Sequence, residues 1–431
     1  MKRKIVAVTL AVLLSGNVNG QTLTEAVQLT LTTNPDILAT EHNLTAAEAL
    51  LRQARAGYFP SLDLVLAGGR ENSNNTTTRA ANLEDLRLDR QESSLRLTQM
   101  IYDGSATRNF VRQQSALVDA ALLRLAGSHE TVGLRAIQVY LEVLRRKAVV
   151  GLANDNLRQH EETLLKIQER YDGGVGTKVD VVQTEGRRAQ SKSNVLLSQR
   201  DEKNGEAQFF RVVGEQATDL MVPAEITGLP TTLEMAIETA FSNNPNLKAA
   251  QADLVAAQAA HKQASAAFKP RFDLELGATR NDDTDGSLGA NDDETAVIRM
   301  SYNLYRGGAD RARSNEVEAR EFAARETVRS IQRQRGVRED VTLIWNELQD
   351  ILLRLEYLQA HVASTEEVLV VYNEQLGLGK RTLLDLLDVQ NELLRARVGL
   401  LTGQYAVLFA RYRVLASGGG LMQGLGLDTA R

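Results

Sequence analysis

Cysteine is absent from this chain of 431 residues, and prolines and aromatic residues are scarce. Six prolines and an aromatic content of 5% favour long helices over a compact sandwich. Without cysteine the chain can form no disulfide, and we expect no lipid anchor on an amino-terminal cysteine. Apolar residues still make up 43% of the sequence, which is enough for a substantial core.

Long apolar runs are also missing after residue 20, so no segment predicts a transmembrane helix. The first residues combine a basic start, Met1–Lys4, with a short apolar run, Ile5–Leu14, and small residues before Gln21. This pattern predicts a secretory signal peptide over residues 1–20. Removing its three basic residues would change the formal net charge from −5 to −8, which makes nucleic acid an unsuitable partner.

The remaining chain reads as an internal duplication. Each half starts with a helix that an Asn-Pro pair interrupts, at Asn34-Pro35 and at Asn244-Pro245. Two alternating strands around a polar loop and a long helical hairpin then follow in each half. The first repeat spans 21–213, with strands over about 61–68 and 94–102, a polar loop over 68–91 and a hairpin tip over about 172–177. The second spans 233–416, with strands over about 271–279 and 295–305 and a tip over about 376–381. Residues 214–232 are the expected linker, and 417–431 are expected to form a flexible tail.

Helical periodicity extends from about Ala106 to Tyr171 in the first half. A continuous helix of that length would measure roughly 100 Å, which exceeds the thickness of any globular core. Such helices must pack along their length against other helices, as in a coiled coil or a helical cylinder.

The strands present apolar faces that suit lipid, with Phe272, Leu274 and Leu276 on one strand and Ile298, Met300, Tyr302 and Leu304 on the next. A soluble β-hairpin would show the same alternation. Four strands cannot close a conducting barrel, and unpaired strand edges are not tolerated in a bilayer. Two chains would give eight strands around a filled interior, whereas three chains would give twelve. The duplication and the helix lengths favour a share of a barrel.

In this order, the features resemble the TolC-type outer-membrane efflux proteins, over essentially the whole mature chain. The resemblance rests on the Asn-Pro helix starts, on Phe59-Pro60 and Lys269-Pro270 before strands, on Tyr102-Asp-Gly and Tyr305-Arg-Gly-Gly after strands, and on the turns Arg170–Gln183 and Leu378–Gln390. It implies an α+β membrane protein in the outer membrane of a Gram-negative cell. Three copies would form a twelve-stranded β-barrel that continues as an α-helical barrel through the periplasm.

The resemblance also implies partners. A periplasmic adaptor protein and an inner-membrane transporter would dock at the tunnel end, and substrate would pass without covalent chemistry or a cofactor. The turn over Tyr372–Asp388 and the absence of a lipid anchor look more like the type I secretion branch, whose transporter is of the ABC type. The alternative is an outlet for multidrug or metal efflux, with a transporter of the RND type.

Charged residues in the second turn are the strongest functional candidates. Asp385 and Asp388 are three residues apart and share a helical face, with Arg381 expected one turn earlier on it. The resemblance places these three residues at the periplasmic gate, with Asp180 as the acidic counterpart in the first repeat. Three copies would form a carboxylate ring that attracts cations. The family often has a tyrosine where this chain has Leu376. The alternative interpretation is a solvated helix with an ordinary Arg381–Asp385 pair.

The register between the two turns is ambiguous at this point. Pairing Asp180 with Asp385 gives an offset of 205, whereas pairing the first tip's Gly-Val-Gly with the second tip's Gly-Leu-Gly gives 203. The glycines permit positive φ at both turns. The resemblance adds that these tips meet the adaptor, through Gly174, Val175, Gly176, Gly377, Leu378 and Gly379.

An acidic loop, Asn281–Asp292, approximates a calcium-binding loop with Asp283, Asp285 and Asp292 as candidate ligands. Position 1 is Asn, position 12 lacks the longer Glu, and strands flank it, so a solvated acidic loop fits better. No catalytic constellation stands out, and an enzyme is not expected. A periplasmic coiled-coil scaffold without a pore would explain the helices but not two matched pairs of strands.

Overall fold

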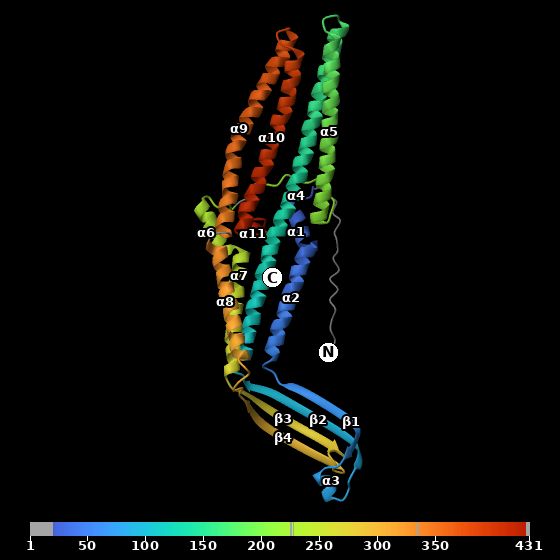
Figure 1. The fold of residues 1–431 in the computed structure, drawn as a ribbon. Coiled ribbons are helices and arrows are strands. Elements are labelled where there is room, and N and C mark those ends of the chain that lie inside the picture. The colour runs from blue at the N-terminus through green and yellow to red at the C-terminus, as the bar shows by residue number, and fades with distance from the viewer. Residues whose placement is uncertain (1–19, 225, 227, 334–335, 428–431) are drawn as a thin grey trace.

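The computed structural model describes residues 20–224, 226, 228–333 and 336–427, so the predicted signal peptide, apart from Gly20, lies outside the described residues. The described chain is elongated, with a sheet of four strands at one end and long helices running away from it (Figure 1). The predicted fold of long antiparallel helices with four antiparallel strands is confirmed. None of the described helices has both the length and the hydropathy that a membrane crossing requires.

The longest helix of the first half, α4, covers nearly the full length of the helical part. This helix has 67 residues and a length of about 100 Å. It starts at the sheet, and α5 returns from the far end to about half-way (Figure 1). The bounds are α1 Leu23–Thr33, α2 Pro35–Ala56, α3 Thr76–Ala80, α4 Ala106–Asp172 and α5 Lys178–Val213.

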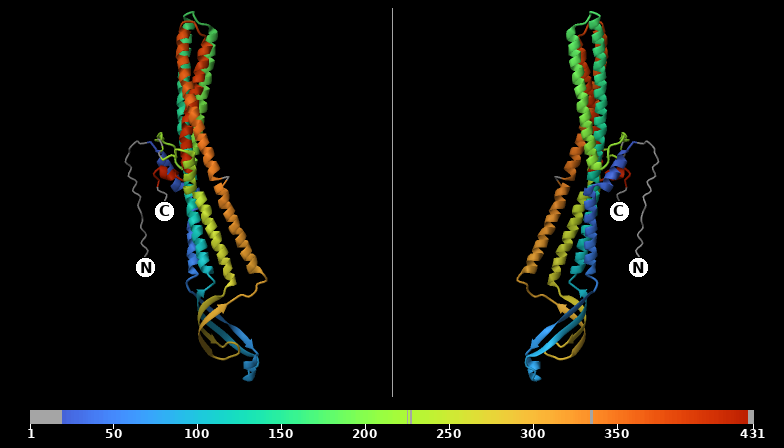
Figure 2. Two further views of the ribbon diagram at one scale, coloured as in Figure 1. Left: turned by 90° about the vertical axis from the view of Figure 1, so that its left-hand side faces the viewer. Right: turned by 90° about the vertical axis from the view of Figure 1, so that its right-hand side faces the viewer.

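In the second half, α8 and α9 follow one another where the first half has the single helix α4. The hairpins α4–α5 and α9–α10 run together to the end opposite the sheet, as the two side views show (Figure 2). The bounds are α6 Leu233–Asn243, α7 Pro245–Ala264, α8 Ala309–Arg333, α9 Val337–Gly377, α10 Leu383–Ser417 and α11 Leu421–Gly424.

Both Asn-Pro pairs separate two helices. Asn34 caps α2, its side chain accepting a hydrogen bond from the backbone N–H of Asp36, and Pro35 takes the first helical position. Asn244 and Pro245 do the same at α7. A proline at this position gives up no helical hydrogen bond, because the first N–H groups of a helix have no partner within it. The chain therefore changes direction here at little energetic expense.

The strands form one antiparallel sheet in the order β1-β2-β3-β4, so β1 and β4 are its edges in the single chain. They extend further than predicted. Residues 68–73 and 86–91, expected in a polar loop, pair with each other across β1 and β2. These strand ends are stabilised by cross-strand ion pairs such as Arg70–Asp89, at 3.0 Å. They lack alternating apolar residues, so the sequence pattern did not indicate a strand here. The bounds are β1 Ser61–Ser73, β2 Leu86–Tyr102, β3 Arg271–Asp282 and β4 Ala290–Ser301.

The end of the fourth strand also differs from the prediction. β4 ends at Ser301 rather than near residue 305, so Tyr302 and Leu304 lie beyond it. Leu304 is 86% exposed in the single chain. The remaining apolar side chains of the predicted faces do share one side of the sheet, because the register pairs Leu274 with Ile298.

The main core lies half-way along the helical part, where α1, α4, α5, α10 and α11 meet. Tyr140 and Phe209 are fully buried there, with ring centroids 6.2 Å apart. The expected flexible tail is wrong for residues 417–427. α11 packs Leu421 and Met422 into this core, and the carboxylate of Glu130 accepts hydrogen bonds from both of their backbone N–H groups. A glycine-rich composition therefore concealed a docked segment.

Candidate functional site

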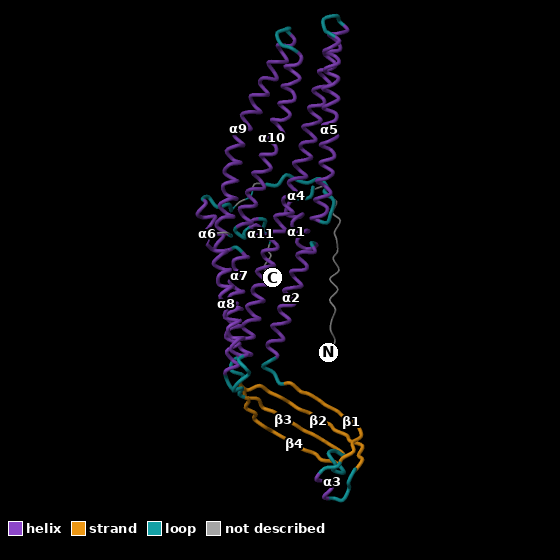
Figure 3. Tube along the Cα trace, in the orientation of Figure 1, coloured by secondary structure: helices purple, strands orange, loops and turns teal. Residues whose placement is uncertain are grey.

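The two hairpin tips lie next to each other at the end of the helices opposite the sheet (Figure 3). The first tip comprises residues 173–177 and the second residues 378–382. A guanidinium N–H of Arg170 donates to the backbone oxygen of Leu376 at 3.4 Å, joining the tips. An apolar cluster then packs α4, α5 and α10 together on the sheet side of this contact; its buried members are Ile167, Val181, Leu383 and Leu387.

Both tips start their second helix with the same capping box. The Thr177 hydroxyl accepts from the Asp180 N–H at 3.2 Å, and the Asp180 carboxylate accepts from Thr177. Thr382 and Asp385 make the same reciprocal hydrogen bonds. Asp180 is therefore the structural counterpart of Asp385. The offset of 205 is right, and the competing offset of 203 is wrong.

The tip backbones repeat at the same offset. Gly174 and Gly379 both have positive φ, at 77° and 72°, and both close the turn after a helix end. This is the position at which only glycine avoids strain. Gly377, in contrast, is the last residue of α9. Val175 and Leu378 are the most exposed apolar side chains of the tips, at 74% and 71%.

Arg381 lies in the second turn and not on a helical face with the two aspartates, which corrects the prediction. α10 starts after Thr382, so the i, i+4 relation of Arg381 to Asp385 does not apply. The guanidinium instead lies 4.5 Å from the centroid of the Tyr372 ring, and its Nε donates to Gln375 at 3.1 Å. Arg381 thus fixes the turn to α9 through a cation–π contact.

Asp388 makes the ion pair that the sequence did not indicate. Its carboxylate accepts from the Arg187 guanidinium of α5 at 2.7 Å, and both groups are partly exposed. Arg187 is therefore a candidate gate residue that sequence reasoning missed. Because Asp388 and Arg187 belong to different hairpins, the pair is a direct polar link between them.

The carboxylate of Asp385 is held charged by the cap. Hydrogen bonds from the Thr382 hydroxyl and from its backbone N–H hold the pKa of Asp385 below its usual range, and the charge of Arg381 acts in the same direction. Asp385 therefore contributes an anionic group near the second tip. Asp385 caps the start of α10, whereas Asp388 links α10 to α5 of the other hairpin.

The candidate calcium ligands are not brought together. Asp292 lies within β4 opposite Arg280. Asp283 accepts from the Gly289 N–H at 2.8 Å, and Asp285 pairs with Arg90. Among the residues that the structure describes, no group of three or more His, Cys, Asp or Glu side chains could hold a metal ion.

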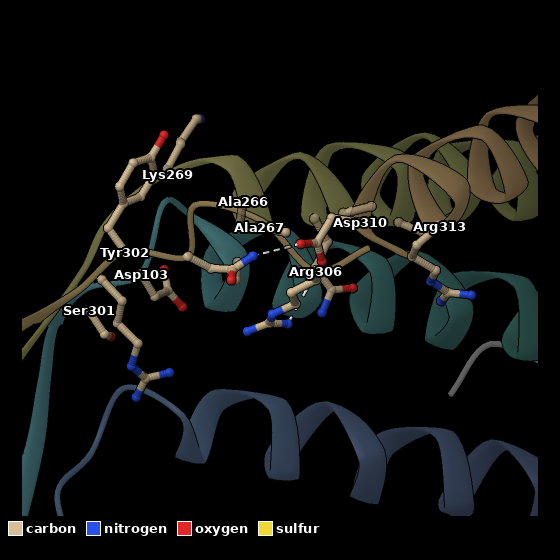
Figure 4. A pocket seen from close by; sticks show the side chains of 15 residues that line it. Asp103, Ala266, Ala267, Lys269, Ser301, Tyr302, Arg306, Asp310 and Arg313 are labelled. Carbon is tan, nitrogen blue, oxygen red and sulfur yellow. Dashed lines mark hydrogen bonds and ion pairs between the residues drawn. The ribbon is translucent and has the colours of Figure 1, made fainter. Parts of the chain in front are cut away.

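A pocket of about 560 Å³ lies where the sheet meets the helices (Figure 4). The hairpin tips are at the opposite end of the helices (Figure 1). Its charged side chains make local contacts. Asp310 accepts from Asn303 at 3.0 Å and pairs with Arg306 at 3.8 Å, and Asp103 accepts from the Thr107 N–H at 2.7 Å. These contacts join the loop after β4 to the start of α8 and fix the start of α4.

Comparison with known proteins identifies the family. Residues 26–215 and 236–420 match the family model described as Outer membrane efflux protein. The chain belongs to this family. It is 27% identical over 340 residues to the Outer membrane efflux protein BepC of Brucella suis biovar 1, a match that covers 78% of the chain and 74% of BepC. It is 22% identical over 415 residues to the Alkaline protease secretion protein AprF of Pseudomonas aeruginosa, covering 91% of the chain and 83% of AprF.

Solved structures show the same fold. A crystal structure of CusC aligns with a TM-score of 0.80 at 16% identity, over 94% of this chain and 92% of that one. The resemblance to TolC-type outer-membrane efflux proteins is therefore confirmed, as is the location in the outer membrane with a large periplasmic helical part. The two matched segments correspond to the two halves of the duplicated chain.

Proposed function

We propose that three copies of this chain form a passive export channel, with a twelve-stranded barrel in the outer membrane and a helical tunnel across the periplasm. The edges of the sheet carry this proposal. β1 and β4 have no partner on their outer sides in the described chain, and one sheet face carries Leu62, Leu64, Leu276 and Ile298. Edges next to lipid must be paired, and twelve strands leave an interior wide enough to conduct.

The two tips are proposed as the gate at the periplasmic end. Asp385 and Asp388 from three copies would set six carboxylates at one constriction, with Asp180 adding charge from the first tip. Arg381 would brace the second tip against α9, and the Arg187–Asp388 pair would hold the hairpins together. The observation that supports a closed position is the set of contacts between hairpins: this ion pair, the Arg170 hydrogen bond and the apolar cluster.

The exposed tips are proposed as the contact for a periplasmic adaptor. Each tip offers one exposed apolar side chain between two glycines: Val175 between Gly174 and Gly176, and Leu378 between Gly377 and Gly379. An inner-membrane transporter would supply the energy for export. Separation of the hairpins would open the tunnel.

Type I secretion is the favoured use of the channel, with an ABC-type transporter. The match to AprF, which is named for alkaline protease secretion, covers 91% of this chain. The alternative, an outlet for small toxic molecules with an RND-type pump, is supported by the match to BepC, which is named for efflux. Deleting the gene distinguishes them: loss of a secreted protein from the medium supports secretion, whereas increased sensitivity to toxic compounds with an unchanged set of secreted proteins supports efflux.

Electron microscopy of detergent-extracted particles tests the assembly. A long cylinder with threefold symmetry and one end in the detergent belt is expected, and a monomer confined to the periplasm would support a scaffold without a pore instead.

Planar bilayers test the gate. Replacing Asp385 and Asp388 together with Asn should weaken cation preference and block by divalent cations, since the constriction loses six negative charges. The Asp36→Asn variant, altered on α2 far from the tips, is the control. Unchanged cation preference in the double variant would remove these residues from the gate.

A further inference from the structure

A buried polar layer lies between the two hairpins, on the sheet side of the tips. Along α4 the residues Ala153, Asn156, His160, Thr163 and Ile167 follow the alternating spacing of three and four that places side chains in a coiled-coil seam. All five are buried, but the three in the middle are polar. Such positions are normally apolar, and polar residues there lower stability.

Hydrogen bonds through this layer join three helices. Ser191 of α5 donates to the Asn156 side chain at 2.8 Å, and Asn156 donates to the backbone oxygen of Gln390 on α10 at 3.3 Å. The Gln390 side chain donates to the Thr163 hydroxyl at 3.0 Å. The layer thus connects hairpin α4–α5 to hairpin α9–α10 through the two hydrogen bonds made by Gln390.

His160 occupies this layer without being part of its hydrogen-bond network. Its side chain is fully buried, and neither ring nitrogen makes a hydrogen bond of normal geometry. Two other histidines do have acidic partners, His361 with Glu392 and His261 with Glu321. A buried imidazole without an acidic partner can stay neutral, but it cannot take up a proton without large loss of solvation energy.

The charged groups around the layer oppose protonation. Arg187 of α5 carries a positive charge toward it, and Asp388 of α10 is engaged with Arg187. Burial lowers the pKa of His160, the Asn391 side chain opposes this shift, and the Arg187 charge adds to it. In the packed state, then, this histidine is held neutral.

We propose that His160 is a proton-sensitive latch between the hairpins: when it is protonated, the contact of α4 with α10 becomes unfavourable, and the inner end of the channel opens. This proposal rests on the proposed gate function. It adds a chemical signal, acidification, that acts on the channel itself and without an adaptor.

The direction of the pH dependence follows from linkage. A histidine whose pKa is lowered in the packed state stabilises that state above its ordinary pKa of about 6.5, and the stabilisation is lost as the pH falls. Each pH unit below about 6.5 favours the separated state by up to about tenfold per site, until the pH reaches the lowered pKa of the packed state. The effect is therefore expected between pH 7.5 and pH 5.5.

The test uses the chain's lack of cysteine. Val175→Cys and Leu378→Cys introduce spin-label sites on the two exposed tips. Pulsed electron paramagnetic resonance then measures the distances between the labels in the trimer. On lowering the pH from 7.5 to 5.5, the population with separated tips should rise several-fold. With His160→Gln, the distance distribution should stay the same. His160→Leu, which fills the seam with an apolar side chain, should give the same insensitivity if the glutamine variant does not assemble.

Two controls identify the proton site. His129, on the same helix, has a pKa that burial lowers, and Glu130 has a pKa that burial raises to about 7. Neither lies at the polar layer, so His129→Gln and Glu130→Gln should keep the wild-type response. An unchanged pH response in both His160 variants, or no response in the wild type, would overturn the latch. Conductance provides a separate readout. If the tips respond to pH but the trimers conduct no ions, the latch proposal stands and the channel proposal is wrong.

Discussion

The two hairpin tips share a backbone but differ in the side chains that hold them. Both have a left-handed glycine and a Thr-x-x-Asp capping box at an offset of 205 residues. At that offset Arg381 corresponds to Gly176, where a Cβ atom would lie 2.9 Å from the backbone nitrogen of Tyr171. The first tip therefore has no room for a side chain at this position, whereas the second adds the contact of Arg381 with Tyr372.

This difference indicates how a duplicated turn can acquire two roles. The shared features are those that any tight turn between two helices needs, so they carry little information about function. The features present in one tip only, Arg381 and the charge of Asp388, are those that a gate can use. Among the proposed gate residues, Arg381 and Asp388 are therefore the two whose contacts the turn geometry alone does not explain.

The largest expected effect comes from the left-handed glycines. Gly174→Ala and Gly379→Ala should each destabilise their own tip by about 1–2 kcal/mol, because an L residue is strained at positive φ. Hydrogen exchange of the tip amides measures this local loss. Gly377→Ala is the matched control, since Gly377 ends a helix, and a Cβ there meets nothing within 4 Å. If Gly377→Ala destabilised the tip as much as Gly379→Ala, the equivalence of the two turns would be wrong.

A smaller effect is expected from the capping boxes. Thr177→Ala and Thr382→Ala should each weaken the start of their helix by about 1 kcal/mol, and Thr→Ser should restore most of it. The cap lowers the pKa of Asp385. The stabilisation that the cap provides is therefore complete above the ordinary pKa of an aspartate, and it is lost only as the pH falls through the lowered pKa. In the His160→Gln variant, which removes the proposed pH-sensitive latch, hydrogen exchange at the second tip should therefore show the same protection, after correction for intrinsic rates, from pH 5 to pH 8. Unequal losses at the two tips would show that the caps are not equivalent.

Much of the fold could be predicted because its signals are local. The Asn-Pro pairs, the alternating strands and the glycine turns each depend on a few adjacent residues. The long strand ends were missed because ion pairs such as Arg70–Asp89 stabilise them in place of apolar side chains. α11 was missed because three glycines in a row, Gly418–Gly420, are also typical of a mobile tail.

The candidate site was less predictable, because its contacts join residues that are distant in sequence. Arg187 and Asp388 are 201 residues apart, and nothing in either local sequence indicates the other. Arg381 was placed on a helix that starts two residues later, a difference within the usual uncertainty of a helix boundary. His160 belongs to no motif in the sequence, and only the packing of α4 against α10 shows that it is buried.

The smallest expected effect concerns the one ion pair that connects the hairpins through Asp388. Arg187→Ala should weaken the closed contact by about 0.2–1 kcal/mol, because both partners are partly exposed and screened. That range corresponds to a rise in resting open probability of about 1.4-fold to fivefold per pair in planar bilayers. Arg188→Ala, altered at an exposed neighbour on α5, is the control and should leave the resting conductance unchanged. Exchanging the charges, with Arg187→Asp and Asp388→Arg together, should restore closure that either change alone removes. If each single variant closes as firmly as the wild type, the pair is a surface contact, and the apolar cluster with Ile167 and Leu387 holds the hairpins together without it.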